Sequence, residues 1–157
     1  MARADYDAVV ISPFGALGIN AQDALTSIDF LRRGVRPRPA RTPLAREVCA
    51  QLRAYFSNPR HVFDLPLAVH GSAYQERVWR ALRRIPAGRV LSYGQLAGKL
   101  ASGARAVGSA CRANPVPIVV PCHRVISAGG GLGGFMGSQA PTQLAIKQWL
   151  LAHERAD

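Results

Sequence analysis

The chain has 157 residues, of which 48% are hydrophobic, and its formal net charge is +11 at pH 7. This length and composition predict a real hydrophobic core, in one compact domain or two small ones. No apolar run approaches membrane-spanning length, and residues 1–5 lack the apolar region of a signal peptide, so we expect a soluble cytoplasmic protein with no membrane partner. The three cysteines, Cys49, Cys111 and Cys122, are odd in number and widely spaced, which favours reduced thiols over a disulfide framework or a zinc site.

The charge is distributed unevenly along the chain. Between Glu76 and Glu154 there is no acidic residue. The cations of this acid-free stretch are Arg77, Arg80, Arg83, Arg84, Arg89, Lys99, Arg105, Arg112, Arg124 and Lys147. A long segment with one sign of charge indicates a polyanionic partner, most often nucleic acid. A solubilising surface is the alternative.

The first part of the chain is predicted to form a small β-sheet. Strands are expected over Tyr6–Ser12 and Ala24–Leu31, with turns at residues 13–15 and 18–20. A basic loop rich in proline follows over residues 32–41. This loop either contacts phosphates or is a solvated connector.

A helix is predicted after the basic loop. Thr42 and Pro43 are typical of an N-cap and a first helical turn, and Asn58-Pro59 ends the helix. Residues 1–65 are therefore predicted to form an N-terminal subdomain of sheet and helix. A linker joins it to a C-terminal domain over residues 72–157.

The C-terminal domain is predicted to be mostly helical. Two capping boxes, Ser72 with Gln75 and Ser92 with Gln95, mark the starts of two helices. A turn containing glycine separates the second of these from a further helix over residues 104–113, and this arrangement is typical of a helix-turn-helix. The fold class is therefore α+β, with a DNA-binding helix-turn-helix in the second domain.

The second helix of this pair has a slim face of small residues that could approach DNA closely. Arg105 and Arg112 are expected to point outward from it, and Ser102 in the turn can cap it. Asn114-Pro115 ends the helix, because a residue that precedes proline disfavours helical geometry.

Cys122 is the strongest candidate nucleophile. It follows an apolar run over residues 116–120 and precedes His123, and a thiol needs a nearby base or cation to react as a thiolate. Glu154, near the end of a final helix, is the carboxylate expected to orient His123. Neighbours on a strand point to opposite faces, so unless the backbone turns at Pro121 we expect a water to bridge the thiol and the imidazole. A buried structural cysteine is the alternative.

Residues 129–134 match the G-x-G-x-x-G pattern of dinucleotide sites. Too little chain follows for a βαβ unit, so we reject that reading. We expect this segment to form a flexible wall or lid over a pocket, followed by the final helix over residues 141–154.

Several motifs together resemble those of the O6-alkylguanine-DNA alkyltransferases. The matching segments are Ser92-Tyr93-Gly94, Arg105-Ala106-Val107-Gly108, Asn114-Pro115, Pro121-Cys122-His123-Arg124-Val125 and Lys147 with Leu150-Leu151-Ala152-His153-Glu154. The resemblance covers residues 72–155. It implies DNA repair by direct damage reversal, in which the alkyl group of O6-alkylguanine, and of O4-alkylthymine, moves once and for all to Cys122, without a cofactor.

The resemblance also implies a role for each matching residue. Cys122 accepts the alkyl group, while His123 and Glu154 activate it through a water. Asn114 fixes the segment between the second helix and the acceptor. Tyr93 lines the pocket and either helps to turn the phosphate or protonates the leaving guanine. Residues expected to contact DNA are Arg105, Tyr93, Gly94, Ala106, Arg112 and Ser102, with Arg105 filling the gap left by the flipped nucleotide. Residues expected to line the base pocket are Val125, Phe135 and Gly137.

The implied partner is double-stranded DNA that carries an alkylated guanine, bound through its minor groove. The protein is expected to act as a cytoplasmic monomer that joins the nucleoid when bound to DNA, and clustering along DNA is left open. Two features depart from the family pattern. The loop over residues 134–147 is longer, which leaves the range of accepted alkyl groups open, and the first sixty residues hold only Cys49, so no metal is expected.

Three other functions compete with repair. A non-catalytic alkyltransferase-like protein binds alkylated DNA but lacks the acceptor cysteine, which Cys122 argues against. A helix-turn-helix regulator has no need of a cysteine and histidine behind its second helix. A cysteine hydrolase has no need of so basic a half, and adjacent residues rarely form a catalytic dyad.

Overall fold

The computed structural model describes residues 5–155. Residues 1–4, part of the segment that lacks a signal-peptide pattern, lie outside the described part, as do residues 156 and 157. The chain divides into two compact units, Met1–Val69 and His70–Asp157, which we call the N-terminal and the C-terminal unit. No helix in the described part is long and apolar enough to cross a membrane.

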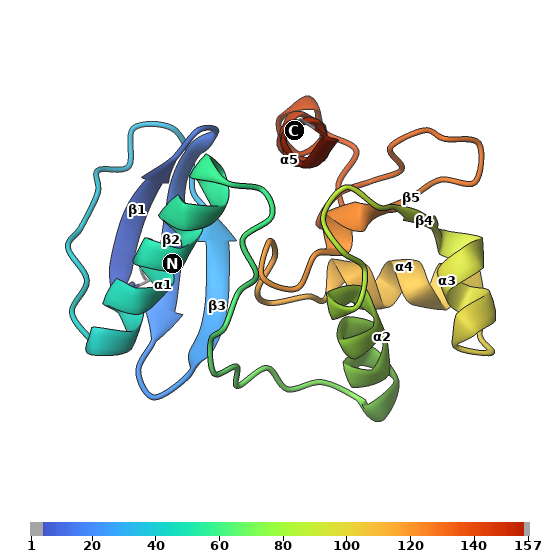
Figure 1. Ribbon diagram of the computed structural model, residues 1–157, viewed down its shortest axis with the longest axis horizontal. Coiled ribbons are helices and arrows are strands. Elements are labelled where there is room, and N and C mark those ends of the chain that lie inside the picture. Colours follow the sequence, from blue (N-terminus) through green and yellow to red (C-terminus); the bar gives the residue numbers. More distant parts are fainter. Residues whose placement is uncertain (1–4, 156–157) are drawn as a thin grey trace. The chain divides into compact units, whose positions relative to one another are not determined.

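The N-terminal unit is a three-stranded antiparallel sheet with one helix. Strands β1 (Ala8–Ser12), β2 (Gly15–Ala21) and β3 (Leu25–Phe30) lie side by side in that order, and α1 (Pro43–Ser57) packs across the sheet (Figure 1). The predicted N-cap of α1 is confirmed, because the hydroxyl of Thr42 accepts a hydrogen bond from the first helical turn at 2.9 Å.

The prediction of a turn at residues 18–20 is wrong, because these residues lie within β2. Gly18 pairs with Val9 on one side and with Asp29 on the other. A Cβ atom at Gly18 would lie 2.6 Å from the ring of Tyr6. The glycine therefore makes room for an aromatic ring on the sheet and does not serve a turn.

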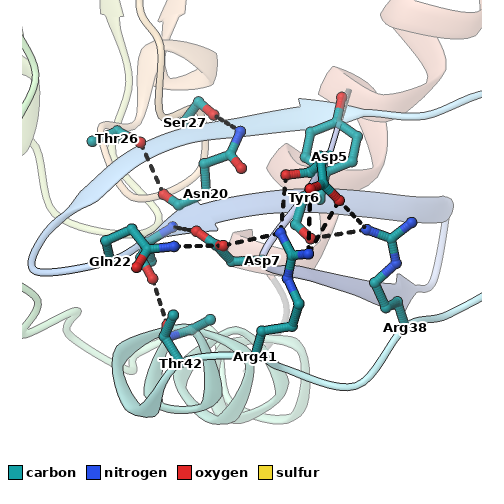
Figure 2. A network of polar contacts seen from close by, with 12 residues as sticks. Asp5, Tyr6, Asp7, Asn20, Gln22, Thr26, Ser27, Arg38, Arg41 and Thr42 are labelled. Carbon is teal, nitrogen blue, oxygen red and sulfur yellow. Dashed lines mark hydrogen bonds and ion pairs between the residues drawn. The ribbon is translucent and has the colours of Figure 1, made fainter. Parts of the chain in front are cut away.

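Two arginines of the basic loop are bound to carboxylates near the start of β1 (Figure 2). Asp7 is buried and accepts hydrogen bonds from the backbone of β2 at 2.9 Å and from Arg41 at 3.4 Å. Arg38 and Arg41 each lie 3.2 Å from the carboxylate of Asp5. Both side chains are thus engaged within the N-terminal unit itself.

The C-terminal unit is mostly helical. Its helices are α2 (Ala73–Arg83), α3 (Tyr93–Lys99), α4 (Ala104–Arg112) and α5 (Pro141–Arg155). Both predicted capping boxes are present, one at the start of α2 and one at the start of α3. Helices α3 and α4 pack against each other across a short turn, and α2 packs on α4, as a helix-turn-helix requires (Figure 1). The predicted α+β class is confirmed.

Polar contacts tie α2 to the helix-turn-helix. The indole Nε1 of Trp79 donates to the carbonyl oxygen of Ala110 at 2.9 Å, inside the core. The prediction that Ser102 caps α4 is wrong, since the N-cap is Gly103 and no side chain bonds there. The hydroxyl of Ser102 instead shares a hydrogen bond with the phenol of Tyr74 on α2, which holds the turn.

Two very short strands complete the unit. Strands β4 (Leu91–Ser92) and β5 (Val125–Ile126) pair in parallel. They bring the segment that starts α3 beside the segment that follows Cys122. Strands of this length carry no periodic pattern, so the sequence does not predict them.

Candidate active site

Cys122 begins a single turn of 3₁₀-helix, η1 (Cys122–Arg124), and its residue is only 3% exposed. The backbone turns at Pro121, where the amide of Cys122 donates to the carbonyl oxygen of Val120 at 2.8 Å. Just before it, Ile118 has φ of +76°, a left-handed conformation that is unusual for a β-branched residue. The thiol is thus presented from a tight turn and not from a strand.

Asn114 holds the segment that precedes the thiol. Its Nδ2 donates to the carbonyl oxygen of Val120 at 2.8 Å, and its Oδ1 accepts from the amide of Val116 at 3.0 Å. Asn114 is buried. Burial raises the pKa of the Cys122 thiol, and Asn114 and the Lys147 ammonium oppose that increase.

His123 and Glu154 form a buried pair, and Arg124 completes it. Nε2 of His123 donates to Oε2 of Glu154 at 2.7 Å, and both side chains are almost fully buried. Arg124 grips the same carboxylate with two hydrogen bonds, of 2.9 Å and 3.0 Å, and donates to the carbonyl oxygen of Ile85. Burial alone would raise the pKa of Glu154, but hydrogen bonds from His123 and Arg124 outweigh it and lower that pKa well below its usual range.

The second ring nitrogen of His123 is left available. Burial lowers the pKa of His123 despite its bond to Glu154, so the imidazole is neutral at pH 7. The hydrogen bond to Glu154 assigns the ring proton to Nε2. Nδ1 is buried and has no hydrogen-bond partner among the described residues. An unpaired, neutral imidazole nitrogen is the form that can accept a proton.

Lys147 lies in the core of the C-terminal unit. It is fully buried, and its Nζ donates to the carbonyl oxygens of Val125, Leu132 and Gly134 at 2.7, 2.6 and 2.9 Å. Burial lowers its pKa to about 8. In the sequence, Lys147 lies one helical turn before Leu150, which is also buried. Residues three apart lie on the same helix face, so this spacing indicates that Lys147 faces the core.

Two cations of the acid-free stretch are therefore internal. Lys147 binds backbone carbonyls and Arg124 binds Glu154. The expectation that the cations of this stretch serve a polyanionic partner is wrong for these two, because each binds groups inside the C-terminal unit.

A pocket of about 530 Å³ opens over the thiol. It is bounded by the start of α3, by α4 and by the loop before α5. Its lining includes Tyr93, Arg105, Cys111, Arg112, Cys122, Phe135, Met136 and Gly137. The phenol of Tyr93 has its pKa raised by burial to about 12, so it stays protonated.

Apart from His123, Glu154 and Asn114, the predicted site residues fall into three groups. Cys122, Tyr93, Phe135 and Gly137 line the pocket, together with Arg105 and Arg112, which are exposed on α4. Gly94 and Ala106 are exposed on the helix-turn-helix, and Ser102 is partly exposed. Val125 does not line the pocket, contrary to prediction. Its side chain is fully buried, and its carbonyl oxygen serves Lys147.

Two sulfur-bearing residues of the pocket were not predicted to be there. Cys111, expected only as a reduced thiol, lines the pocket, and burial raises its pKa to about 12. Met136 lies in a loop, where no periodic pattern indicates a facing direction, and its Sδ is 3.8 Å from Sγ of Cys122.

The fold and the pocket define a helix-turn-helix protein that carries a buried free cysteine in a pocket beside its second helix. The family described as "6-O-methylguanine DNA methyltransferase, DNA binding domain" matches residues 73–156. The chain is 43% identical to the methylated-DNA–protein-cysteine methyltransferase of Mycolicibacterium paratuberculosis, over 93% of this chain and 90% of the relative. It is 37% identical to the human protein of that name, over 91% and 77%. The crystal structure of Mycobacterium tuberculosis OGT in complex with DNA superposes with a TM-score of 0.79 at 34% identity, covering 94% of this chain and 91% of the other.

The chain belongs to the O6-methylguanine-DNA methyltransferase family. The family resemblance of its motifs is thereby confirmed.

Proposed function

We propose that this chain repairs DNA by direct reversal, moving the alkyl group of O6-alkylguanine onto its own Cys122. One observation carries the proposal: the Cys122 thiol lines a pocket at the helix-turn-helix, directly followed in the chain by a histidine paired with a buried carboxylate. Relatives that are named as methylated-DNA–protein-cysteine methyltransferases support the same reaction. DNA is the partner of the helix-turn-helix.

The reaction is a displacement at the alkyl carbon. A water between Sγ of Cys122 and the free Nδ1 of His123 carries the thiol proton to the imidazole, and the ionised Glu154 stabilises the resulting imidazolium. The thiolate then forms a bond to the alkyl carbon as the bond from that carbon to O6 breaks. The electron pair of the broken bond stays on guanine, which gains the proton that the imidazolium gives up. The products are therefore unmodified guanine and a thioether.

Tyr93 and Asn114 assist this step in different ways. Tyr93 lines the pocket with its hydroxyl protonated, so it can donate a hydrogen bond to the leaving guanine. Asn114 fixes the backbone in front of the acceptor through its two hydrogen bonds. A thioether is not a substrate for any nucleophile among these residues, so each molecule reacts once and needs no cofactor.

Access to the buried O6 atom requires that the base leave the duplex. Extrusion costs roughly a few kcal/mol, and contacts that fill the vacated space offset part of it. Arg105 is exposed in the first turn of α4 and also lines the pocket. An arginine is always charged and has a planar head, which suits it to this vacancy. Arg112, Gly94, Ala106 and Ser102 supply the remaining contacts.

The same proposal covers the mode of binding and the setting. The small residues of α4 fit the minor groove, O4-alkylthymine is a second substrate, and the protein acts as a monomer in the cytoplasm, at the nucleoid when bound to DNA. The non-catalytic binder is not favoured, because the acceptor cysteine is present.

Intact mass spectrometry tests this function. After incubation with a duplex that contains O6-methylguanine, the protein should gain one methylene unit, and peptide mapping should locate it on Cys122. The Cys122→Ala variant should gain nothing, whereas Cys49→Ala, which removes a thiol of the N-terminal unit, should react as the unaltered chain does. An unchanged mass would overturn the proposal.

A further inference from the structure

A methionine side chain lies against the acceptor thiol. Sδ of Met136 is 3.8 Å from Sγ of Cys122, and both residues line the same pocket. For transfer, the alkyl carbon must come to about 3–3.5 Å from Sγ. The carbon under attack and the methionine thioether are then both immediate neighbours of the thiol, so any substituent on that carbon competes for space with the side chain of Met136.

The backbone that places Met136 there is a tight two-residue turn. Phe135 and Ser138 exchange two backbone hydrogen bonds, of 2.9 Å and 3.0 Å, which leaves Met136 and Gly137 at the tip. Their φ angles are +52° and +76°, and positive φ at both central residues is the pattern of a type I′ turn. The left-handed conformation is unfavourable for a residue with a Cβ, because the Cβ comes too close to the neighbouring backbone. Such a conformation persists only where neighbouring contacts enforce it.

Three contacts hold this turn in place. A Cβ atom on Gly137 would lie 2.7 Å from Nε of Arg112, so the arginine side chain lies directly against the tip. Phe135 is buried, and the carbonyl oxygen of Gly134 accepts from Lys147 at 2.9 Å. Because the backbone is held on both sides, Met136 can yield to a ligand only by rotating its own side chain.

We propose that Met136 determines which alkyl groups Cys122 accepts, by forming a yielding wall of the alkyl subsite that favours methyl over larger groups. This inference rests on the proposed function and names the substrate class within it. Methionine has three rotatable side-chain bonds, so it can move aside at some expense. Larger groups should therefore react more slowly and not fail outright.

Two substitutions at this position separate volume from sulfur chemistry. Met136→Ala removes most of the side chain, while Met136→Leu keeps a similar volume without the thioether. Both retain a Cβ at the left-handed position, so their backbone strain is comparable. Gln148→Ala, an exposed position on α5, is the matched control.

The measurement is the single-turnover rate constant with two duplexes, one carrying O6-methylguanine and one carrying O6-benzylguanine. In Met136→Ala, the ratio of the benzyl to the methyl rate constant should rise at least about 10-fold. A small change of volume in an apolar pocket can supply discrimination of this size. Met136→Leu and Gln148→Ala should keep the ratio of the unaltered chain. Thermal unfolding of each variant, together with its methyl transfer rate, establishes that the fold is retained.

The outcomes are distinct. An unchanged ratio in Met136→Ala overturns the inference and leaves the repair function standing. A ratio that also rises in Met136→Leu overturns it too, since volume would not be the cause. Absence of methyl transfer in the unaltered chain overturns the proposed function itself.

Discussion

Glu154 is bound by both Arg124 and His123, and this arrangement fixes the tautomer of the histidine. Arg124 binds the carboxylate with two hydrogen bonds, and His123 binds it with one. The arginine keeps Glu154 ionised, so the carboxylate accepts a hydrogen bond from Nε2 of His123 and the proton stays on the nitrogen. The imidazole is thereby fixed in the tautomer whose Nδ1 can take a proton. Removing one partner of a buried ion pair leaves the other charge uncompensated, which lowers the free energy of unfolding by about 3–5 kcal/mol.

The rate of alkyl transfer should depend on pH through His123. Burial lowers the pKa of this group below its ordinary 6.5, so the neutral base is present at pH 7 and is lost only in more acidic solution. A plot of the transfer rate constant against pH should rise through a midpoint below 6.5 and then level off. Because Glu154 supports the charged imidazole, Glu154→Gln should move the midpoint further toward acid and lower the plateau about 100-fold or more. A midpoint above 6.5 would contradict the assignment.

At the scale of elements, α5 acts through Lys147 as the anchor of the loops around the pocket. The ammonium group donates to the carbonyl oxygen of Val125 in β5 and to those of Leu132 and Gly134 in the loop before α5. The carbonyl groups of Leu132 and Gly134 lie in a loop, where no strand or helix satisfies them. The side chain of Lys147 thus donates the hydrogen bonds that a strand or helix would otherwise supply to this loop.

Replacing Lys147 by methionine should destabilise the protein. The change keeps most of the apolar stem but leaves carbonyl groups without a donor, and we expect a loss of about 2–4 kcal/mol in the free energy of unfolding. Urea denaturation of the full chain measures it. Lys99→Met, at an exposed position on α3, is the control and should stay within about 0.5 kcal/mol. Equal effects of the two substitutions would refute the anchoring role.

At the scale of the whole molecule, the charges divide between interior and surface. Arg124 and Lys147 serve the interior of the C-terminal unit, and Arg38 and Arg41 are paired within the N-terminal unit. The cations that remain exposed in the acid-free stretch are Arg77, Arg80, Arg83, Arg84, Arg89, Lys99, Arg105 and Arg112. This exposed set is available to phosphates, and contacts to phosphates bind DNA without regard to its sequence.

DNA affinity should fall steeply with salt, and Arg105 should matter only on duplex substrates. We expect affinity to drop at least about 10-fold between 50 and 200 mM salt, because bound phosphates release counterions. Fluorescence anisotropy with a labelled duplex measures this drop. Arg105→Ala should slow transfer from duplex O6-methylguanine far more than reaction with free O6-benzylguanine. Equal losses on both substrates, or a flat salt response, would contradict the proposed DNA contacts.

Local chemistry made much of this protein predictable. The capping boxes of α2 and α3 depend on residues three apart, and the proline and glycine breaks act where they stand, so the helices of the C-terminal unit could be predicted from short segments. The family motifs around Cys122 are likewise contiguous. Hence the fold class, the helix-turn-helix and the candidate nucleophile followed from the sequence by itself.

The remainder depends on residues that meet only after folding. By its local sequence Gly18 is expected in a turn, but in the folded chain it makes room for the Tyr6 ring. By its local sequence Lys147 is expected on the surface, but in the folded chain it donates to three carbonyl oxygens. Met136 lies in a loop, and only the turn at residues 135–138 directs it to the thiol. Local patterns predict where a chain bends and where its helices are capped. Burial and side-chain partners depend on contacts between segments that are distant in the sequence, so they are fixed only once the chain has folded.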